Sequence, residues 1–183
     1  MSELRVDKIF PKNGISAGTF NAGGIIQMKY GESSDQSTYS FNNQTFAPVT
    51  IHSVSITPTS ASNKILIFGK MSANCTSNTA LNFEWGVYLK RGSTVIGGNS
   101  DPGGLMGGNG CQASMLNVPE AGGTTNYTYL DSPATTSTVT YHNCLQGGES
   151  STYACNRPTN NSHGSYNFTN TGNTSLLLME VAA

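Results

Sequence analysis

The sequence has little charge. Asp, Glu, Lys and Arg make up 10% of its 183 residues, against about 25% in an ordinary soluble domain. A monomer normally stays soluble through interspersed charges on its surface. The deficit therefore suggests that much of this surface is covered by other subunits or carries uncharged hydroxyl and amide groups. Fibres and shells have surfaces of this kind.

The sequence also lacks basic runs and long apolar runs. The nine Lys and Arg residues are scattered and the formal net charge is −1, so we expect no nucleic-acid partner. No apolar stretch approaches the roughly 20 residues that span a bilayer. The opening MSELRVDKIF has no apolar core of the kind that a secretory signal needs. We therefore expect no membrane insertion, and a chain that is made in the cytosol and kept there until it is released.

Cysteine pairs with metal-binding spacing are absent. Cys75, Cys111, Cys144 and Cys155 are far apart and form no CxxC motif, which argues against a structural zinc site. The residues between Cys144 and Cys155 read as a loop that a disulfide would close, but assembly in the cytosol favours reduced thiols.

Catalytic motifs are absent as well. There is no nucleophile elbow, zinc-protease motif, P-loop or dinucleotide-binding fingerprint. His52, His142 and His163 fall on different predicted elements and share no ligand spacing, so we assign them no role. A glycan-cleaving protein needs paired carboxylates, which strands can bring together from distant positions. The acids are few, however, and Glu84 beside Trp85 reads as the solvent-facing half of a strand. We expect no enzyme, no cofactor and no metal.

The sequence does have period-two patterning from Ile25 onward. Ile26, Met28 and Tyr30 alternate with Gln27 and Lys29, which is typical of a half-buried strand. Strands are predicted around residues 25–30, 49–56, 65–71, 83–90, 94–96, 113–118, 126–130, 139–146, 165–170 and 176–181. No window has an apolar stripe at helical spacing.

Many short strands without a βαβ rhythm predict an all-β, two-sheet antiparallel jelly-roll sandwich, with a barrel as the alternative. The segment 176–181 is apolar on both faces until Glu180, as expected for a strand at the centre of a sandwich or at a seam between subunits.

The first 24 residues differ from the rest. Five of the nineteen charges fall within the first twelve residues, and turn-forming residues follow. This pattern predicts a short extended N-terminal arm over residues 1–24 and a head over residues 25–183, although a frayed terminus would read similarly. Within the head, segments 97–110 and 147–164 carry little patterning and predict long surface loops. Such loops either present polar groups to a ligand or are tolerated insertions.

Several blocks spread over most of the chain carry a resemblance. They are SELRVDKIFPKNGI with GGIIQMKY, SITPTSASNKILI, LKRGSTVIG, YLDSPATTSTVTY and SLLLMEVA. These blocks resemble a family of short proteins of marine phages, especially cyanophages, usually labelled tail-fibre or virion structural proteins. From about residue 25 to 183 the arrangement also resembles the trimeric jelly roll of the tumour-necrosis-factor and complement globular-head type.

The resemblance implies a non-enzymatic homotrimer that is assembled in the host cytoplasm and located in the virion. Its arm would dock to a phage tail or capsid adaptor protein through Leu4, Val6, Ile9 and Phe10. Its loops would meet a host-surface glycan or protein. The candidate receptor contacts, chosen for expected exposure and hydrogen-bonding capacity, are Asn99, Asp101, Asn109, Tyr153, Arg157, Asn160 and His163.

The chain has no long repetitive shaft, which favours a short tail fibre or appendage over a full-length fibre. Two alternatives stay open. One is a purely structural capsid-decoration or tail-knob protein, and the other is a glycan-degrading tail protein.

Overall fold

The computed structural model describes residues 24–41, 47–78, 82–83, 85–97, 115–116, 122–147, 151–156 and 172–183. Within these ranges the chain forms strands and turns but no helix. The strands are β1 (Ile25–Ser33), β2 (Thr38–Phe41), β3 (Val49–Ile56), β4 (Lys64–Asn78), β5 (Asn82–Phe83), β6 (Trp85–Arg91), β7 (Thr94–Gly97), β8 (Met115–Leu116), β9 (Gly122–Asp131), β10 (Val139–Gly147), β11 (Ser151–Cys155) and β12 (Thr174–Val181).

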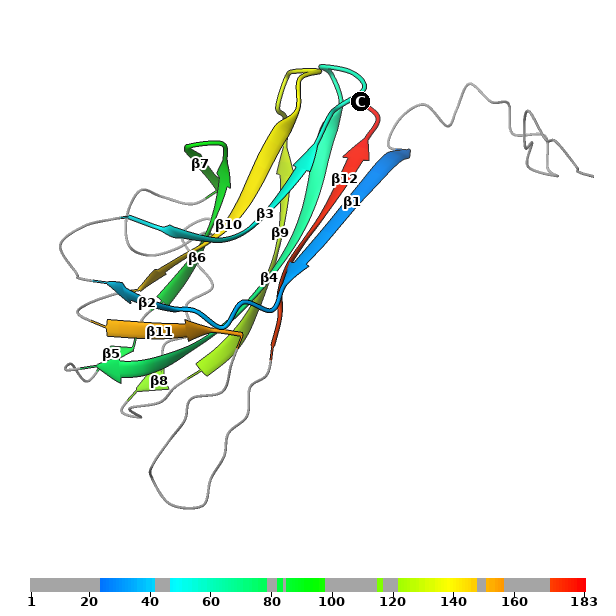
Figure 1. The fold of residues 1–183 in the computed structure, drawn as a ribbon. Helices are drawn as coiled ribbons and strands as arrows, with labels where there is room; N and C mark the ends of the chain where they lie inside the picture. The colour runs from blue at the N-terminus through cyan, green and yellow to red at the C-terminus, as the bar shows by residue number, and fades with distance from the viewer. Residues whose placement is uncertain are drawn as a thin grey trace, which may run out of the picture.

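The main strands pair in a nested order. In the larger sheet β1 pairs with β12 and β4 with β9, and in the smaller sheet β3 pairs with β10 and β6 with β7. All of these pairs are antiparallel, and β1 lies beside β12 in Figure 1. Strands near the two ends of the sequence therefore pair with each other, and the pairing closes inward on the β6–β7 hairpin. A long ribbon coiled in this way is a jelly roll, so the predicted all-β jelly-roll sandwich is confirmed.

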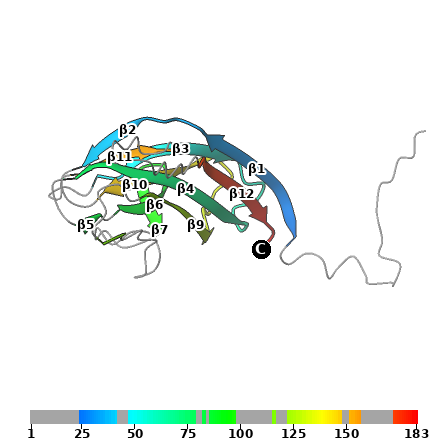
Figure 2. The same ribbon diagram turned by 90° about the horizontal axis from the view of Figure 1, so that it is seen from below.

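The long strand β4 organises the larger sheet. Along one edge it pairs with β9. Along the other it pairs first with β12, over 64–70, and then with β11, over 73–78. Strand β2 adds outside β11, so β11 and β2 continue the sheet beyond β12 and β1 (Figures 1 and 2). A separate short ladder joins β5 to β8.

Side chains from both sheets meet in one core. In β12 every second residue is buried, and Leu176 and Leu178 have no exposed surface. In β6 every residue from Trp85 to Leu89 is buried. Burying one large apolar side chain contributes about 1.5–3 kcal/mol, so these strands supply much of the driving force for folding.

One glycine makes room for a core aromatic ring. Gly69 of β4 lies opposite Tyr127 of β9 in the ladder. A Cβ atom at Gly69 would lie 2.0 Å from Cζ of Tyr127 and 2.2 Å from its Cε1. The ring therefore occupies the space that any larger residue at position 69 would fill.

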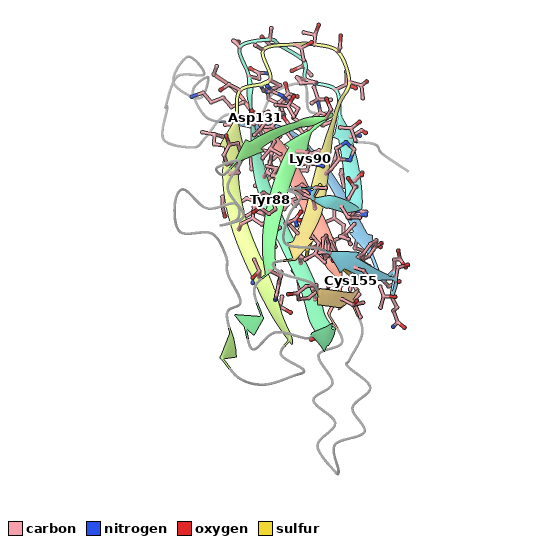
Figure 3. All side chains as sticks on the ribbon, turned by 90° about the vertical axis from the view of Figure 1, so that its left-hand side faces the viewer. Tyr88, Lys90, Asp131 and Cys155 are labelled. Carbon is pink, nitrogen blue, oxygen red and sulfur yellow. The ribbon has the colours of Figure 1, made fainter. Side chains whose placement is uncertain are left out.

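A buried charge network ties the two sheets together. Asp131 of β9 receives two hydrogen bonds from Nη1 of Arg91 in β6, at 3.0 and 2.9 Å. Its Oδ2 also accepts a hydrogen bond from the hydroxyl of Tyr141 in β10, at 2.6 Å. Asp131 lies near one end of the sandwich, away from Cys155 (Figure 3). Because the acid is buried, each of these charge-assisted bonds stabilises the junction.

A second buried acid holds the turn between β3 and β4. Glu180 of β12 has no exposed surface. Its carboxylate accepts hydrogen bonds from Nε2 of Gln27, at 2.6 Å, and from the backbone N–H of Thr59, at 2.7 Å. The Thr59 hydroxyl at 2.8 Å and Nδ2 of Asn63 at 2.6 Å also donate to it. The residue that ends the apolar run of β12 is thus a structural anchor.

The predicted strands overlap the observed ones, although β4 runs to Asn78 whereas the prediction ended at residue 71. Three further differences stand out. Strands β2 and β11 are additional, and β11 falls inside the predicted loop 147–164, so that part of the loop prediction is wrong. Segment 165–170 lies outside the described residues. The third difference is β1, where Ile26, Met28 and Tyr30 were expected on a buried face but are 45%, 61% and 61% exposed.

Candidate functional site

Most of the predicted contact residues lie outside the described residues. This holds for the arm residues Leu4, Val6, Ile9 and Phe10 and for the loop residues Asn99, Asp101, Asn109, Arg157, Asn160 and His163.

Tyr153 is described, and it corrects the prediction made for it. It lies on β11 with no exposed surface, and its ring meets the edge of Phe41 at a centroid distance of 6.0 Å. The tyrosine was taken as exposed because its neighbours are polar, but pairing of β11 with β4 and β2 turns the ring into the core. It is a packing residue and not a receptor contact.

The described residues nevertheless show how one predicted loop is held. Asn156 directly follows β11 and is 3% exposed. Its side-chain Nδ2 donates to the backbone oxygens of Ser33, at 3.1 Å, and Asp35, at 2.9 Å. Its Oδ1 accepts from the hydroxyl of Thr174, at 3.0 Å, and its backbone N–H donates to Ser72 O, at 3.1 Å. One residue thus joins the β1–β2 connection, β4 and β12.

The far end of the same segment returns to the same place. Gly172 precedes β12, and a Cβ atom there would lie 2.2 Å from Oγ of Ser72. Asn156 and Gly172, the described residues on either side of 157–171, therefore both lie against Ser72 of β4. Asn156 has a backbone φ of +55°, a conformation that asparagine tolerates better than most residues. We call Asn156, Ser72, Thr174 and Gly172 the loop clamp.

A second surface lies on the larger sheet, on the side away from the core. Its members are apolar side chains from β1, β12, β4 and β9, and we call them the outer face: Met28, Tyr30, Leu66, Phe68, Leu130, Leu177 and Met179. Met28, Tyr30, Phe68 and Leu130 are exposed, and the other three are half-buried.

The strand register aligns these side chains in rows across the sheet. One row, read across β1, β12, β4 and β9, is Met28, Met179, Leu66 and Leu130, and the next is Tyr30, Leu177, Phe68 and Thr128. Residues directly opposite each other on one face of a sheet lie in side-chain contact distance. The outer face is therefore a continuous apolar strip four strands wide.

A polar border closes one end of this strip. Nζ of Lys70 donates to Oδ1 of Asn173, at 2.8 Å, and Nδ2 of Asn173 donates to Oε2 of Glu32, at 2.7 Å. The Tyr30 hydroxyl donates to the same oxygen, at 2.7 Å, and this hydrogen bond raises the pKa of Tyr30. The lysine and the glutamate are thus linked through Asn173 within the chain.

A shallow groove of about 550 Å³ lies where the strip meets this border. Phe68 and Leu177 form its apolar side. Its other side-chain walls come from polar residues, namely Lys70, Asn126, Thr128 and Ser175.

The described side chains offer neither a group of metal ligands nor a reactive thiol. Over the described ranges, His, Cys, Asp and Glu side chains do not gather in any group of three or more that would hold a metal ion. Cys144 and Cys155 are both free and buried. Burial raises the pKa of both thiols, that of Cys155 to about 12 with a further contribution from Asp35, so neither is a reactive thiolate at neutral pH.

Sequence reasoning missed the loop clamp, and it anticipated the outer face only in part, as the seam between subunits offered as one reading of segment 176–181. The clamp residue Asn156 has no local signal, because its partners come from three distant segments. The outer face did have a signal: alternation in β1 together with a β12 that is apolar on both faces.

None of the described residues belongs to a helix with the length and hydropathy of a membrane span. No protein-family model matches the sequence, and no curated protein matches it. The solved structures that align with the chain include those of the Gx and Gt strains of infectious bursal disease virus. The Gx structure is 11% identical with a TM-score of 0.37, and the Gt structure is 12% identical with a TM-score of 0.37. Each alignment covers 86% of this chain and 38% of the viral chain, so this chain spans less than two fifths of the length of these neighbours.

Proposed function

We propose that the chain is a non-enzymatic component of a phage virion, a homotrimeric tail fibre or appendage. Its N-terminal arm, residues 1–24, docks to a tail or capsid adaptor protein. Its head, residues 25–183, presents loops to a host-surface glycan or protein. The sequence blocks that resemble marine-phage virion proteins support the virion setting, and the low charge of the chain fits a surface that is partly covered by other subunits.

The loop clamp is the observation that carries the recognition role. Recognition loops work from rigid scaffolds, and the described residues on either side of 157–171 are held firmly. Asn156 is hydrogen-bonded to Ser72 of β4 and to Thr174 of β12, and Gly172 packs against Ser72. Three heads held together would present three copies of this segment to one surface. Weak individual contacts then gain strength through effective concentration.

The two buried acids support the non-enzymatic part of the proposal. Asp131 and Glu180 are buried and held by structural hydrogen bonds. Neither can serve as an acid or base for a bound substrate without breaking the junction it holds. Release of sugar from isolated host envelope polysaccharide by the purified protein would contradict this part and favour the glycan-degrading alternative.

The recognition role is tested by shortening the clamped segment. Particles carrying the protein with 157–171 replaced by a short Gly-Ser linker should assemble normally but adsorb to host cells about tenfold more weakly, or worse. Particles with Ser93→Ala, in the exposed β6–β7 turn, are the matched control. Normal assembly with unchanged adsorption would contradict host recognition by this segment and favour the capsid-decoration or tail-knob alternative.

A further inference from the structure

The exposure of β1 conflicts with its sequence pattern. Met28 and Tyr30 alternate with polar residues as a buried face does, yet both are 61% exposed in the single chain. Isolated exposed apolar residues are common on soluble proteins. A continuous strip in register over four strands is not, and it indicates a surface that another body covers.

The size of the outer face suits a protein interface. Its most exposed members range from 40% exposure at Phe68 to 61% at Met28 and Tyr30. Since a large apolar side chain has on the order of 200 Å² of surface, the whole face presents on the order of 500 Å². A stable interface buries about 800 Å² on each partner, of which little more than half is apolar. The outer face therefore supplies the apolar part of one such interface.

The charges around the face favour a neutral partner. Neither apolar row contains a charged residue. At the border, Lys70 and Glu32 are bridged by Asn173 within the same chain. Lys64, exposed beyond Leu66 at the other end of the face, adds one charge. A single lysine is too little to select a strongly acidic partner, whereas a surface of the same nearly uncharged composition would fit.

The chain itself can supply two occupants for this face, its own N-terminal segment or a second copy, and the width of the face favours the second copy. Four strands are about 15 Å across, because neighbouring strands lie about 4.8 Å apart. A single extended segment, such as residues 1–23 of the same chain, has the width of about one strand and would leave most of the strip uncovered. The sheet of a second molecule has the required width.

We propose that the outer face is the surface through which copies of this chain associate, so that Met28, Tyr30, Phe68 and Leu130 of one copy are buried against a second copy. This inference rests on the self-association in the proposed function and names the surface that carries it. Burial against a second copy would explain why apolar and polar residues alternate in β1, just as burial in the core explains the alternation in β12.

The inference is tested by placing charge on the face and measuring molar mass by light scattering during size-exclusion chromatography, over a range of concentrations. Met28→Glu and Phe68→Glu each should weaken association by about 30-fold or more, because a charge would be buried at an apolar contact. Both positions are exposed in the single chain, so circular dichroism and thermal melting should show a folded protein. Ser55→Glu, on an exposed position of β3 in the smaller sheet, is the matched control and should associate like the unaltered chain.

Each outcome has a definite meaning. If the unaltered chain is oligomeric and both face variants are equally oligomeric, the assignment of this face is wrong while self-association stands. If the unaltered chain is a single-chain species at all concentrations, both the face and the homotrimer are wrong. If removal of residues 1–23 dissociates the oligomer or newly exposes the face to the dye 8-anilinonaphthalene sulfonate, the arm is the occupant and the inference is overturned.

Discussion

Replacing Asn156 with alanine removes the centre of the loop clamp in one step. The alanine variant loses the two hydrogen bonds to the Ser33 and Asp35 oxygens and the one from the Thr174 hydroxyl. It also places alanine at a φ of +55°. Since Asn156 lies between the β1–β2 connection, β4 and β12, we expect both global stability and the hold on segment 157–171 to suffer.

The expected loss in the free energy of unfolding depends on how deeply each hydrogen-bond partner of Asn156 is buried. Thr174 has no exposed surface, so its hydroxyl would lose its acceptor inside the protein, at a cost of about 1–3 kcal/mol. The carbonyls of half-buried Ser33 and exposed Asp35 would regain water, so each loss costs about 1 kcal/mol or less. The left-handed conformation adds about 1 kcal/mol for alanine. We expect a loss of about 3–4 kcal/mol in the free energy of unfolding.

Urea unfolding followed by circular dichroism measures this loss, and Asn156→Gly separates its causes. Glycine loses the same hydrogen bonds but tolerates the positive φ, so it should be about 1 kcal/mol more stable than the alanine variant. Limited proteolysis should cut both variants within 157–171 faster than the unaltered chain. A loss below about 1 kcal/mol for Asn156→Ala, with unchanged proteolysis, would refute the clamp.

Three other predictions concern the packing and the buried acids. Burial alone would raise the pKa of Glu180, but its hydrogen bonds lower the pKa from 4.5 to about 2, so its contribution is complete above pH 4.5 and fades as the pH falls toward 2. Glu180→Gln should cost about 3 kcal/mol at pH 7 by urea unfolding and little at pH 2, and a difference that does not shrink with pH would contradict this. Gly69→Ala should lower the thermal midpoint well below that of Gly92→Ala, since the first change drives a Cβ into an aromatic ring, while the second meets nothing within 4 Å and costs only about 1 kcal/mol for its φ of +57°; equal midpoints would count against the packing described. Tyr141→Phe should cost about 1.5–3 kcal/mol in urea unfolding by removing a hydrogen bond to a buried carboxylate, and a neutral result would show that the hydroxyl contributes nothing.

The fold class was predictable because it depends on local patterning. Strand β3 was predicted with its observed bounds, 49–56, and most other strands within a few residues, since period-two alternation survives wherever one face meets a core. Strands β2 and β11 were missed because each is five residues or shorter and, unlike β7 with Val95 and Ile96, lies among Ser, Thr, Asn and Gly. Patterning over so few residues does not separate a strand from a loop.

The candidate sites were less predictable because they depend on distant partners. Glu180 read as the end of an apolar run, but its donors come from β1 and the β3–β4 turn. Tyr153 was predicted to be an exposed loop residue because the residues next to it in the sequence do not indicate that β11 pairs with β4. Met28 was predicted to be buried but is exposed in the single chain. The proposed contact with a second copy would bury it.

The central claim, the proposal that the chain is a component of a phage virion, is tested most directly by a cryo-electron reconstruction of that particle. We expect the chain on the outside of the virion, with residues 4–10 in contact with a tail or capsid protein and the 157–171 segment directed away from the particle. A particle that lacks the chain, or one in which the head is turned inward and the arm makes no contact, would contradict the proposed role.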